Sequence, residues 1–196
     1  RDRVYAIDAK TGALIEPFGQ AGGQFIDLTR DLPVPPELAD IEVTTPGTVF
    51  ENYLIVTSRV PEGNTSTPGD IRAYNAATGK FEWIFNTIPR KGQVGYDTWA
   101  FEPNMHYGGA NVWGGVTVDE QRGWVFAAPG SAAGEFIYGG SRKGDNLFAN
   151  TVLALNARTG GRIWHYQIIR HDIWDYDLPP APILATITTK NGTRDV

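Results

Sequence analysis

The sequence predicts an all-β protein built of four-stranded antiparallel units, a segment of a β-propeller. A seven-residue pattern, Ala, apolar, Asp or Asn, Ala, any residue, Thr, Gly, occurs three times, from Ala6, Ala73 and Ala154. Apolar residues alternate before each copy, which is the period of a half-buried strand. The chain of 196 residues also holds 23 Gly and 13 Pro, and no long amphipathic helical pattern is visible. Such regular repetition indicates a repeat architecture.

Each copy of the pattern predicts the turn of a β-hairpin. The Asp or Asn side chain can bond the backbone that follows it, and Gly accepts a positive φ. A second strand is expected after the turn, at 80–85 and again at 162–168. Trp83 and Trp164 stand four residues after the Gly of their copies. The sequence therefore repeats one hairpin design.

Two complete four-stranded units are predicted between partial ones. The expected strands are 43–50, 54–59, 70–75 and 80–85 in the first unit, and 112–119, 124–129, 151–156 and 162–168 in the second. A hairpin over 3–18 and a strand over 182–188 would belong to neighbouring units. The predicted division is 1–27 (end of one blade), 42–86 (blade), 111–169 (blade) and 178–196 (start of the next). Closed propellers need about 4 to 8 blades, so we interpret the chain as a segment of a longer protein; the alternative is a small self-contained β-domain.

Composition excludes several functions. The formal net charge is −5 and no basic run occurs, so the electrostatic footprint of nucleic-acid binding is missing. With no Cys, disulfides, thiol catalysis and Cys-based metal sites are excluded. No apolar stretch approaches the roughly 18 residues of a membrane helix. No signal peptide is visible, and a segment that opens inside a hairpin would not show one.

The richest group of polar and aromatic residues is the run His-Asp-Ile-Trp-Asp-Tyr-Asp at 171–177, at the exit of a predicted strand. Links between propeller blades lie at the end of the central channel, where ligands bind. A carboxylate between Trp and Tyr, such as Asp175, can have a raised pKa and act as a general base. The alternative is a turn in which Asp side chains bond backbone amides. Spacing alone leaves both open.

Two further groups carry possible chemistry. Glu62, on a loop after an apolar strand, can ligate a metal, and Arg59 can hold a carboxylate; the alternative is a solvated loop with a surface ion pair. Trp113 is flanked by Gly residues in Gly-Gly-Ala-Asn-Val-Trp-Gly-Gly, which suits a flat ligand stacking on its ring. A structural Trp between sheets is the alternative there.

In combination these motifs resemble the quinoprotein dehydrogenases that use pyrroloquinoline quinone (PQQ), in particular the branch of the membrane-bound glucose dehydrogenases and their sugar, polyol and cyclic-alcohol relatives. The resemblance covers essentially the whole chain. It rests on the hairpin repeats, Val-Thr-Ser-Arg-Val-Pro-Glu at 56–62, the Gly-rich run around Trp113, and above all 171–177 followed by Leu-Pro. It implies an eight-bladed propeller of four-stranded antiparallel blades. Trp83 and Trp164 would be docking residues between blades.

The resemblance also implies a role for five residues. Asp175 matches the catalytic base that takes the substrate hydroxyl proton while hydride passes to the quinone. Glu62 matches an acidic ligand of the active-site Ca²⁺. Trp113 matches the floor under the planar cofactor, and Arg59 and Thr44 match positions that contact PQQ.

Two positions affect the predicted metal site. Methanol-oxidising relatives place an Asn on the metal where this chain has Ser131, whose hydroxyl is a poorer ligand. Lanthanide-dependent relatives carry an extra acidic ligand at the position of Asp177, but the glucose-type branch also has an Asp there. We therefore expect Ca²⁺ rather than Mg²⁺ or a lanthanide. The family's Lys or Arg that bonds the quinone oxygen would fall beyond Val196.

The predicted function is oxidation of an alcohol or sugar, with a quinone or cytochrome as electron acceptor, in the bacterial periplasm. Attachment to the membrane would come from a region outside this segment, and the remainder of the propeller would be the main partner. Two alternatives belong to other classes: a non-enzymatic propeller scaffold of the bacterial envelope, which has no reason to keep Glu62, Trp113 and 171–177 together, and a glycoside hydrolase with two carboxylates flanking a sugar.

Overall fold

The computed structural model describes residues 2–19, 23–30, 32, 39–63, 66–101, 107–134, 140 and 142–196. None of the elements in these ranges is a helix long and apolar enough to cross a membrane. The elements are β1 (Arg3–Val4), β2 (Ile26–Asp27), β3 (Thr48–Phe50), β4 (Tyr53–Val56), β5 (Ile71–Asn75), β6 (Phe81–Phe85), the 3-10 helix η3 (Tyr96–Thr98), β7 (Val116–Asp119), β8 (Trp124–Ala127), β9 (Thr151–Asn156), β10 (Arg162–Gln167), β11 (Thr186–Thr189) and β12 (Gly192–Asp195).

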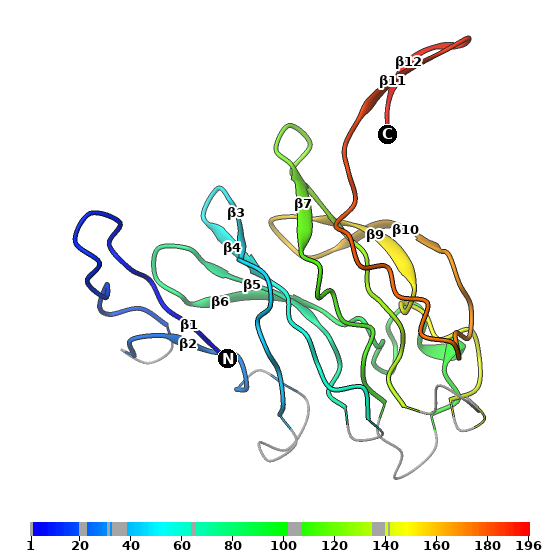
Figure 1. Cartoon of the computed structure of the whole chain (residues 1–196), viewed down its shortest axis with the longest axis horizontal. Coiled ribbons are helices and arrows are strands. Elements are labelled where there is room, and N and C mark those ends of the chain that lie inside the picture. Colours follow the sequence, from blue (N-terminus) through cyan, green and yellow to red (C-terminus); the bar gives the residue numbers. More distant parts are fainter. Residues whose placement is uncertain are drawn as a thin grey trace.

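Two four-stranded antiparallel sheets make up the body of the molecule. Strands β3, β4, β5 and β6 pair in sequence order, and β7, β8, β9 and β10 do the same. Figure 1 shows the two sheets following one another across the molecule in chain order, from cyan to yellow. Each sheet falls inside a range predicted for a complete unit. The prediction of four-stranded antiparallel units is confirmed.

The three repeated turns have the same hydrogen bonding. The Oδ1 atoms of Asp8, Asn75 and Asn156 each accept backbone N–H groups two and three residues later, at 2.8–3.2 Å. The Gly that ends each copy has a positive φ, 73°, 69° and 68° in chain order. The second and third turns join β5 to β6 and β9 to β10, and the first closes on a bridge between Ile7 and Leu14. The predicted hairpin turns are confirmed.

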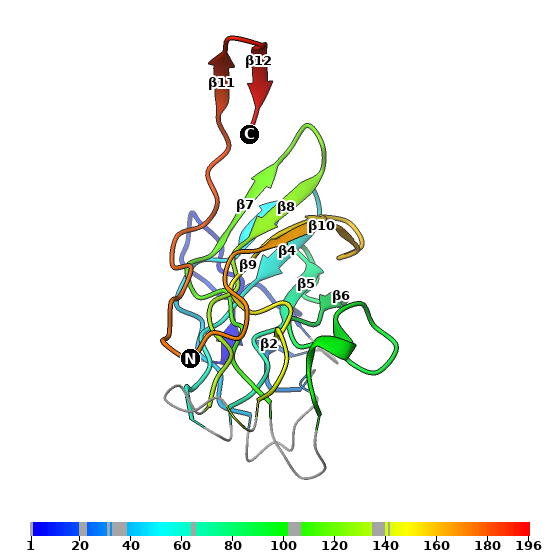
Figure 2. The ribbon, with the colours of Figure 1, turned by 90° about the vertical axis from the view of Figure 1, so that its right-hand side faces the viewer.

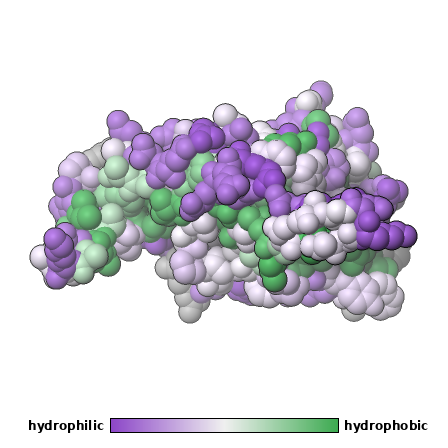
Figure 3. Space-filling model, turned by 90° about the horizontal axis from the view of Figure 1, so that it is seen from above, coloured by the Kyte–Doolittle hydropathy of each residue, from purple (hydrophilic) through white to green (hydrophobic). Residues whose placement is uncertain are grey.

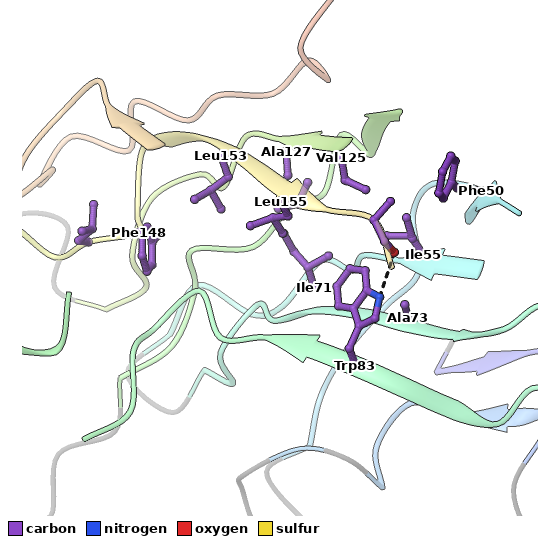
Figure 4. Packing of buried hydrophobic residues seen from close by; sticks show 13 residues of the cluster. Phe50, Ile55, Ile71, Ala73, Trp83, Val125, Ala127, Phe148, Leu153 and Leu155 are labelled. Atoms are coloured by element: carbon purple, nitrogen blue, oxygen red, sulfur yellow. Dashed lines mark hydrogen bonds between the residues drawn. The ribbon is translucent and has the colours of Figure 1, made fainter. Parts of the chain in front are cut away.

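The main core lies between the two sheets and depends on Trp83. This residue is 6% exposed, and its indole donates Nε1–H to the carbonyl of Ala157, in the turn between β9 and β10, at 3.1 Å (Figure 4). The ring packs on Gly160, where a Cβ would come within 2.5 Å of Cε3. Leu153 and Leu155 of β9 face Ile71 of β5 in the same cluster. The expected docking role of Trp83 is confirmed.

A second core joins the N-terminal hairpin to the first sheet. It contains Ile26 and Leu28 from the hairpin side, and Val56 and Tyr74 from β4 and β5, all nearly inaccessible to solvent. The buried guanidinium of Arg72 crosses this boundary and donates to the Leu28 carbonyl. The N-terminal strands β1 and β2 therefore pack on the first four-stranded sheet through a buried core, just as the two four-stranded sheets pack on each other.

Trp164 occupies the position of Trp83 in the next repeat, but it is 39% exposed. It contacts Phe126, with ring centroids 5.9 Å apart. Neighbouring Tyr166 is 70% exposed, and Figure 3 shows hydrophobic surface between hydrophilic regions on the side seen from above. Within the described residues, β10 thus exposes Trp164 and Tyr166, and no four-stranded sheet follows it. Trp164 lines a cavity of about 600 Å³ together with residues of the C-terminal segment such as Leu184 and Val196.

The C-terminal segment differs from the predicted strand over 182–188. Backbone pairing begins only at Ala185, which bonds Val196, and β11 and β12 form a two-stranded hairpin that projects from the sheets (Figures 1 and 2). Pro179, Pro180 and Pro182 precede it, and Pro has no N–H to donate to a strand ladder. The strand therefore starts later than its apolar pattern indicates.

Candidate active site

One cavity of about 310 Å³ collects most of the predicted site residues. Antiparallel pairing explains this, because the ends of β4, β8 and β10 and the start of β7 all lie at the edge opposite the repeated turns. The lining residues are Arg59, Val60, Pro61, Glu62, Gly109, Asn111, Trp113, Ser131, Ala133, Asp175 and Asp177. Of the seven residues predicted for the site, only Thr44 is not in the lining. Its hydroxyl donates to the Trp113 carbonyl, at 3.1 Å.

Asp175 lies on a loop with an unusual backbone, held by Asp172. The φ of Asp175 is 58°, in the left-handed region that few residues other than Gly adopt. The Asp172 carboxylate accepts the N–H groups of Trp174, at 2.9 Å, and Tyr176, at 2.7 Å, on either side of Asp175. Asp172 therefore forms the predicted turn, whereas Asp175 lines the cavity, and its role as a base stays a prediction.

A network of buried polar side chains holds the loop that carries Asp175. Asp172 is 3% exposed and accepts the Ser131 hydroxyl, at 2.7 Å, and Nδ2 of Asn150, at 3.1 Å. The Asn150 amide also donates to the Tyr176 carbonyl, at 2.9 Å. The buried Arg142 donates Nη2–H to the Asp172 carbonyl, at 2.7 Å. We did not predict Asn150 or Arg142, and the sequence holds no signal for them, because their partners lie 22 to 30 positions away.

The two aspartates of the loop have pKa values shifted in opposite directions. Partial burial and the nearby carboxylates of Asp177, Glu62 and Asp172 raise the pKa of Asp175 above its ordinary value, and Ser131 acts weakly against this. Burial also acts to raise the pKa of Asp172, but its hydrogen bonds from Ser131, the loop amides and Asn150 outweigh burial and hold that pKa low. Asp172 is thus a fixed anion, whereas Asp175 has a higher proton affinity.

Asp177 contacts the wall of the cavity through both oxygens. Its Oδ2 accepts the indole N–H of Trp113, at 2.8 Å, and its Oδ1 accepts the backbone N–H of Ser131, at 2.7 Å. The carboxylate lies against Gly130, where a Cβ would come within 2.2 Å of Oδ1. Only Gly at 130 therefore allows this approach.

The backbone next to Trp113 lies in close contact with another segment of the chain. Its ring lines the cavity and the residue is 36% exposed. The next residue, Gly114, lies against the chain that leaves the Asp175 loop, because a Cβ there would come within 1.6 Å of the Pro179 carbonyl oxygen. A bulkier residue would push the two segments apart. The Gly residues around Trp113 thus bring its ring next to the loop.

Glu62 and Arg59 come from the loop after β4. Arg59 forms a partly exposed ion pair with Glu42, at 3.5 Å, while lining the cavity. Three acidic residues, Glu62, Asp175 and Asp177, line this cavity together with one Arg, Arg59. Among the described residues, no three His, Cys, Asp or Glu side chains are grouped closely enough to hold a metal ion by themselves. The Ser131 hydroxyl donates to Asp172. The metal-ligand roles predicted for Glu62, Ser131 and Asp177 stay predictions.

The donor set of the cavity fits a planar anionic cofactor with a divalent cation. Trp113 offers an aromatic ring, Arg59 a partner for a carboxylate, and the acidic residues hard oxygen ligands. Asn111 also lines the cavity, and we did not predict it. Its position two residues before Trp113 is the feature of the sequence that could have indicated a place in the cavity.

Residues 1–196 match the family described as the β-propeller domain of PQQ-dependent glucose, ethanol and alcohol dehydrogenases. The chain belongs to this family. The predicted resemblance is confirmed, and the predicted enzyme class, a quinoprotein dehydrogenase, agrees with the names of the relatives that the chain matches. The assignment favours the dehydrogenase over both the scaffold and the glycoside hydrolase.

Named relatives agree with the family. The chain is 34% identical over 196 residues to a quinate/shikimate dehydrogenase (quinone) of Acinetobacter baylyi, covering 97% of this chain and 23% of that protein. It is 31% identical over 201 residues to quinoprotein glucose dehydrogenase A of Acinetobacter calcoaceticus, again covering 97% of this chain and 23% of the relative. The chain therefore spans about a quarter of the length of the relatives that it matches.

The fold also matches a solved structure. A quinohemoprotein alcohol dehydrogenase of Pseudomonas putida superposes with a TM-score of 0.81 and 27% identity, over 99% of this chain and 28% of that one. The prediction of an all-β propeller segment is confirmed.

Proposed function

We propose that the full-length protein oxidises an alcohol or sugar, with PQQ bound in the cavity and Ca²⁺ beside it. The observation that carries this proposal is the meeting of Glu62, Trp113 and Asp175 in one cavity of a PQQ-dependent dehydrogenase family member. These residues come from three different loops and lie up to 113 positions apart in the sequence. Relatives named for glucose and quinate support a hydroxylated small-molecule substrate.

The proposed chemistry assigns each residue one task. Bound PQQ supplies the electrophilic carbon that accepts a hydride. Asp175 removes the proton of the substrate hydroxyl, since a carboxylate with raised proton affinity suits a general base. Trp113 supports the face of the cofactor, and Arg59 bonds one of its carboxylates. Glu62 binds Ca²⁺, which offsets the excess of negative charge in the cavity. Thr44 would help to hold the backbone of Trp113, because its hydroxyl donates to the Trp113 carbonyl.

Ca²⁺ is preferred in this proposal over Mg²⁺ and lanthanides. A trivalent ion would favour more carboxylate ligands than a divalent one. In the cavity, the carboxylate of Asp177 already accepts N–H groups of the protein, so few carboxylates are left for a cation. We further propose a bacterial periplasmic location and a quinone or cytochrome acceptor, as the resemblance implies. The remainder of the propeller is the structural partner of this segment.

The test is reconstitution of the full-length apoprotein with PQQ and Ca²⁺, followed by dye-linked assays on sugars, polyols, cyclic and simple alcohols. Asp175→Asn should lower kcat by about 10³-fold, since a positioned base contributes roughly 10²–10⁴-fold. Its Kd for PQQ should not weaken by more than about threefold, because the base acts on the substrate. The matched control is Asp97→Asn, at an exposed residue outside the cavity. Near-full turnover by Asp175→Asn would show that another group is the base.

A further inference from the structure

The side chain of Asp177 is directed toward the protein wall. Oδ2 accepts the indole N–H of Trp113, at 2.8 Å, across 64 positions of sequence. Oδ1 accepts the backbone N–H of Ser131, at 2.7 Å. Hydrogen bonds to a carboxylate are short and roughly twice as strong as neutral ones. Asp177 therefore connects three strand ends: the entry to β7, the exit of β8 and the segment after β10.

The bond to the indole restricts the side-chain torsions of Trp113, which its backbone leaves open. Val112 is 1% exposed, and the Trp113 carbonyl accepts the Thr44 hydroxyl, so the main chain is held on this side. The ring could still rotate about its side-chain torsions, since it is 36% exposed and lies beside Gly114 and Gly115. An acceptor at 2.8 Å from Nε1 selects one ring orientation.

We propose that Asp177 is a positioning residue that fixes the ring of Trp113 as the platform for the planar cofactor, an inference that rests on the proposed function. This differs from the metal-ligand role that the sequence indicates for Asp177. Metal ligation would recruit the same oxygens that now accept the indole and Ser131 N–H groups. The two roles predict different responses to substitution, in PQQ affinity for one and in metal affinity for the other.

A double-mutant cycle in the full-length protein measures the coupling. PQQ affinity is determined at fixed saturating Ca²⁺ for the wild type, Asp177→Asn, Trp113→Phe and the double variant. We expect Asp177→Asn to weaken PQQ binding about tenfold, the size of one charged hydrogen bond. In the Trp113→Phe background, which keeps an aromatic face but has no N–H, the same change should cost less than about twofold. Equal losses in both backgrounds would overturn the proposal.

Asp175→Asn is the matched control for charge. It removes a negative charge from the same cavity, but no hydrogen bond of Asp175 to Trp113 exists among the described contacts. Loss of a like charge favours an anionic ligand, so PQQ affinity should stay or rise, opposite to the loss in Asp177→Asn. If both variants change PQQ affinity in the same direction and to the same extent, the effect is one of charge, and the positioning role is wrong.

Asp177→Glu separates positioning from metal binding and serves if Asp177→Asn does not fold. It keeps a carboxylate for a cation but moves its oxygens by one methylene from the indole. The positioning role predicts weaker PQQ binding with the Ca²⁺ or La³⁺ concentration for half-saturation changed by less than about threefold. A tenfold rise in that concentration in Asp177→Asn, restored in Asp177→Glu, would instead establish a metal ligand.

A readout on the apoprotein keeps this inference distinct from the proposed function. In protein labelled with ¹⁵N-tryptophan, the indole resonance that disappears in Trp113→Phe should shift in Asp177→Asn and stay in place in Asp175→Asn. If the wild type does not bind PQQ, the proposed function fails, and an unshifted resonance would separately refute the Asp177–Trp113 contact. A shifted resonance with no PQQ binding by the wild type would overturn the cofactor role assigned to Asp177.

Discussion

Asp172 is the residue on which the geometry of the candidate site depends most. Its buried carboxylate accepts hydrogen bonds from Ser131, Asn150 and two amides that flank Asp175. A carboxylate that accepts several N–H and O–H groups is stable as an anion, and its low pKa agrees with this. The left-handed backbone of Asp175 persists because these bonds define it.

Asp172→Asn should therefore lower kcat without removing the base. The amide N–H₂ would face donors in place of one carboxylate oxygen, leaving at least one buried donor without a partner, at a cost of about 1–3 kcal/mol. We expect kcat to fall about 10- to 100-fold, less than for Asp175→Asn, in steady-state assays. Asp8→Asn, which alters a similar turn outside the cavity, should leave kcat unchanged. Full turnover by Asp172→Asn would mean that the loop geometry does not depend on this carboxylate.

Glu62→Gln tests the predicted cation. A neutral amide oxygen is a weaker ligand for a hard divalent ion than a carboxylate. The Ca²⁺ concentration for half-maximal reconstitution should rise about tenfold or more, with activity partly recovered at high Ca²⁺. Glu82→Gln, at an exposed carboxylate of β6 that does not line the cavity, is the control. An unchanged Ca²⁺ requirement in Glu62→Gln would remove Glu62 from the metal site.

At the scale of elements, the repeated turn has two uses. Its Asp or Asn and Gly close the hairpin, and the same Gly is the surface on which the Trp of the preceding unit docks. Trp83 sits on Gly160 and bonds the carbonyl of Ala157 in the same turn. The first copy has no Trp after it, and Gly79 is instead approached by the backbone of Gly19. Turn and docking site therefore belong to one motif.

A pair of Gly→Ala variants tests the docking use. Gly92, outside the repeated turns, and Gly160 both have a positive φ, 87° and 68°, so Ala costs about 1 kcal/mol of backbone strain at either position. A Cβ at Gly92 meets nothing within 4 Å, whereas at Gly160 it would clash with the ring of Trp83. In thermal denaturation of the full-length protein, Gly160→Ala should lower Tm clearly more than Gly92→Ala, by the equivalent of about 1–3 kcal/mol. Equal shifts would show that Trp83 relaxes freely.

At the scale of the whole molecule, the chain has cores that join each unit to the one before it. The described part of β10 exposes Trp164 and Tyr166, and the C-terminal hairpin projects from the body (Figure 2). The matched relatives are about four times as long as this chain. In a repeat protein, stability depends on such contacts between neighbours.

The isolated segment 1–196 should therefore not melt as a stable cooperative monomer. Exposed strand edges and the exposed aromatic side chains of β10 favour association between copies. Light scattering and differential scanning calorimetry of the purified segment should show aggregation or a broad, weak transition. A sharp transition of a monomer with the heat expected for about 196 ordered residues would contradict this.

The sequence by itself determined the repeats and the turn chemistry, and its resemblance to a family singled out Glu62, Trp113 and Asp175 as candidate site residues. The repeats and turns could be predicted for a simple physical reason. These features are local, because hydrogen bonds of Asp or Asn to the next few amides, alternation of apolar residues and positive φ at Gly need only a few neighbouring residues. The tertiary structure decided which of the aspartates at 171–177 holds the loop and which faces the cavity. It also brought Asn150 and Arg142 beneath the loop and turned Asp177 toward Trp113. Those contacts join residues 22 to 64 positions apart, and their geometry follows from the packing of antiparallel strand ends at one edge, which no local pattern encodes.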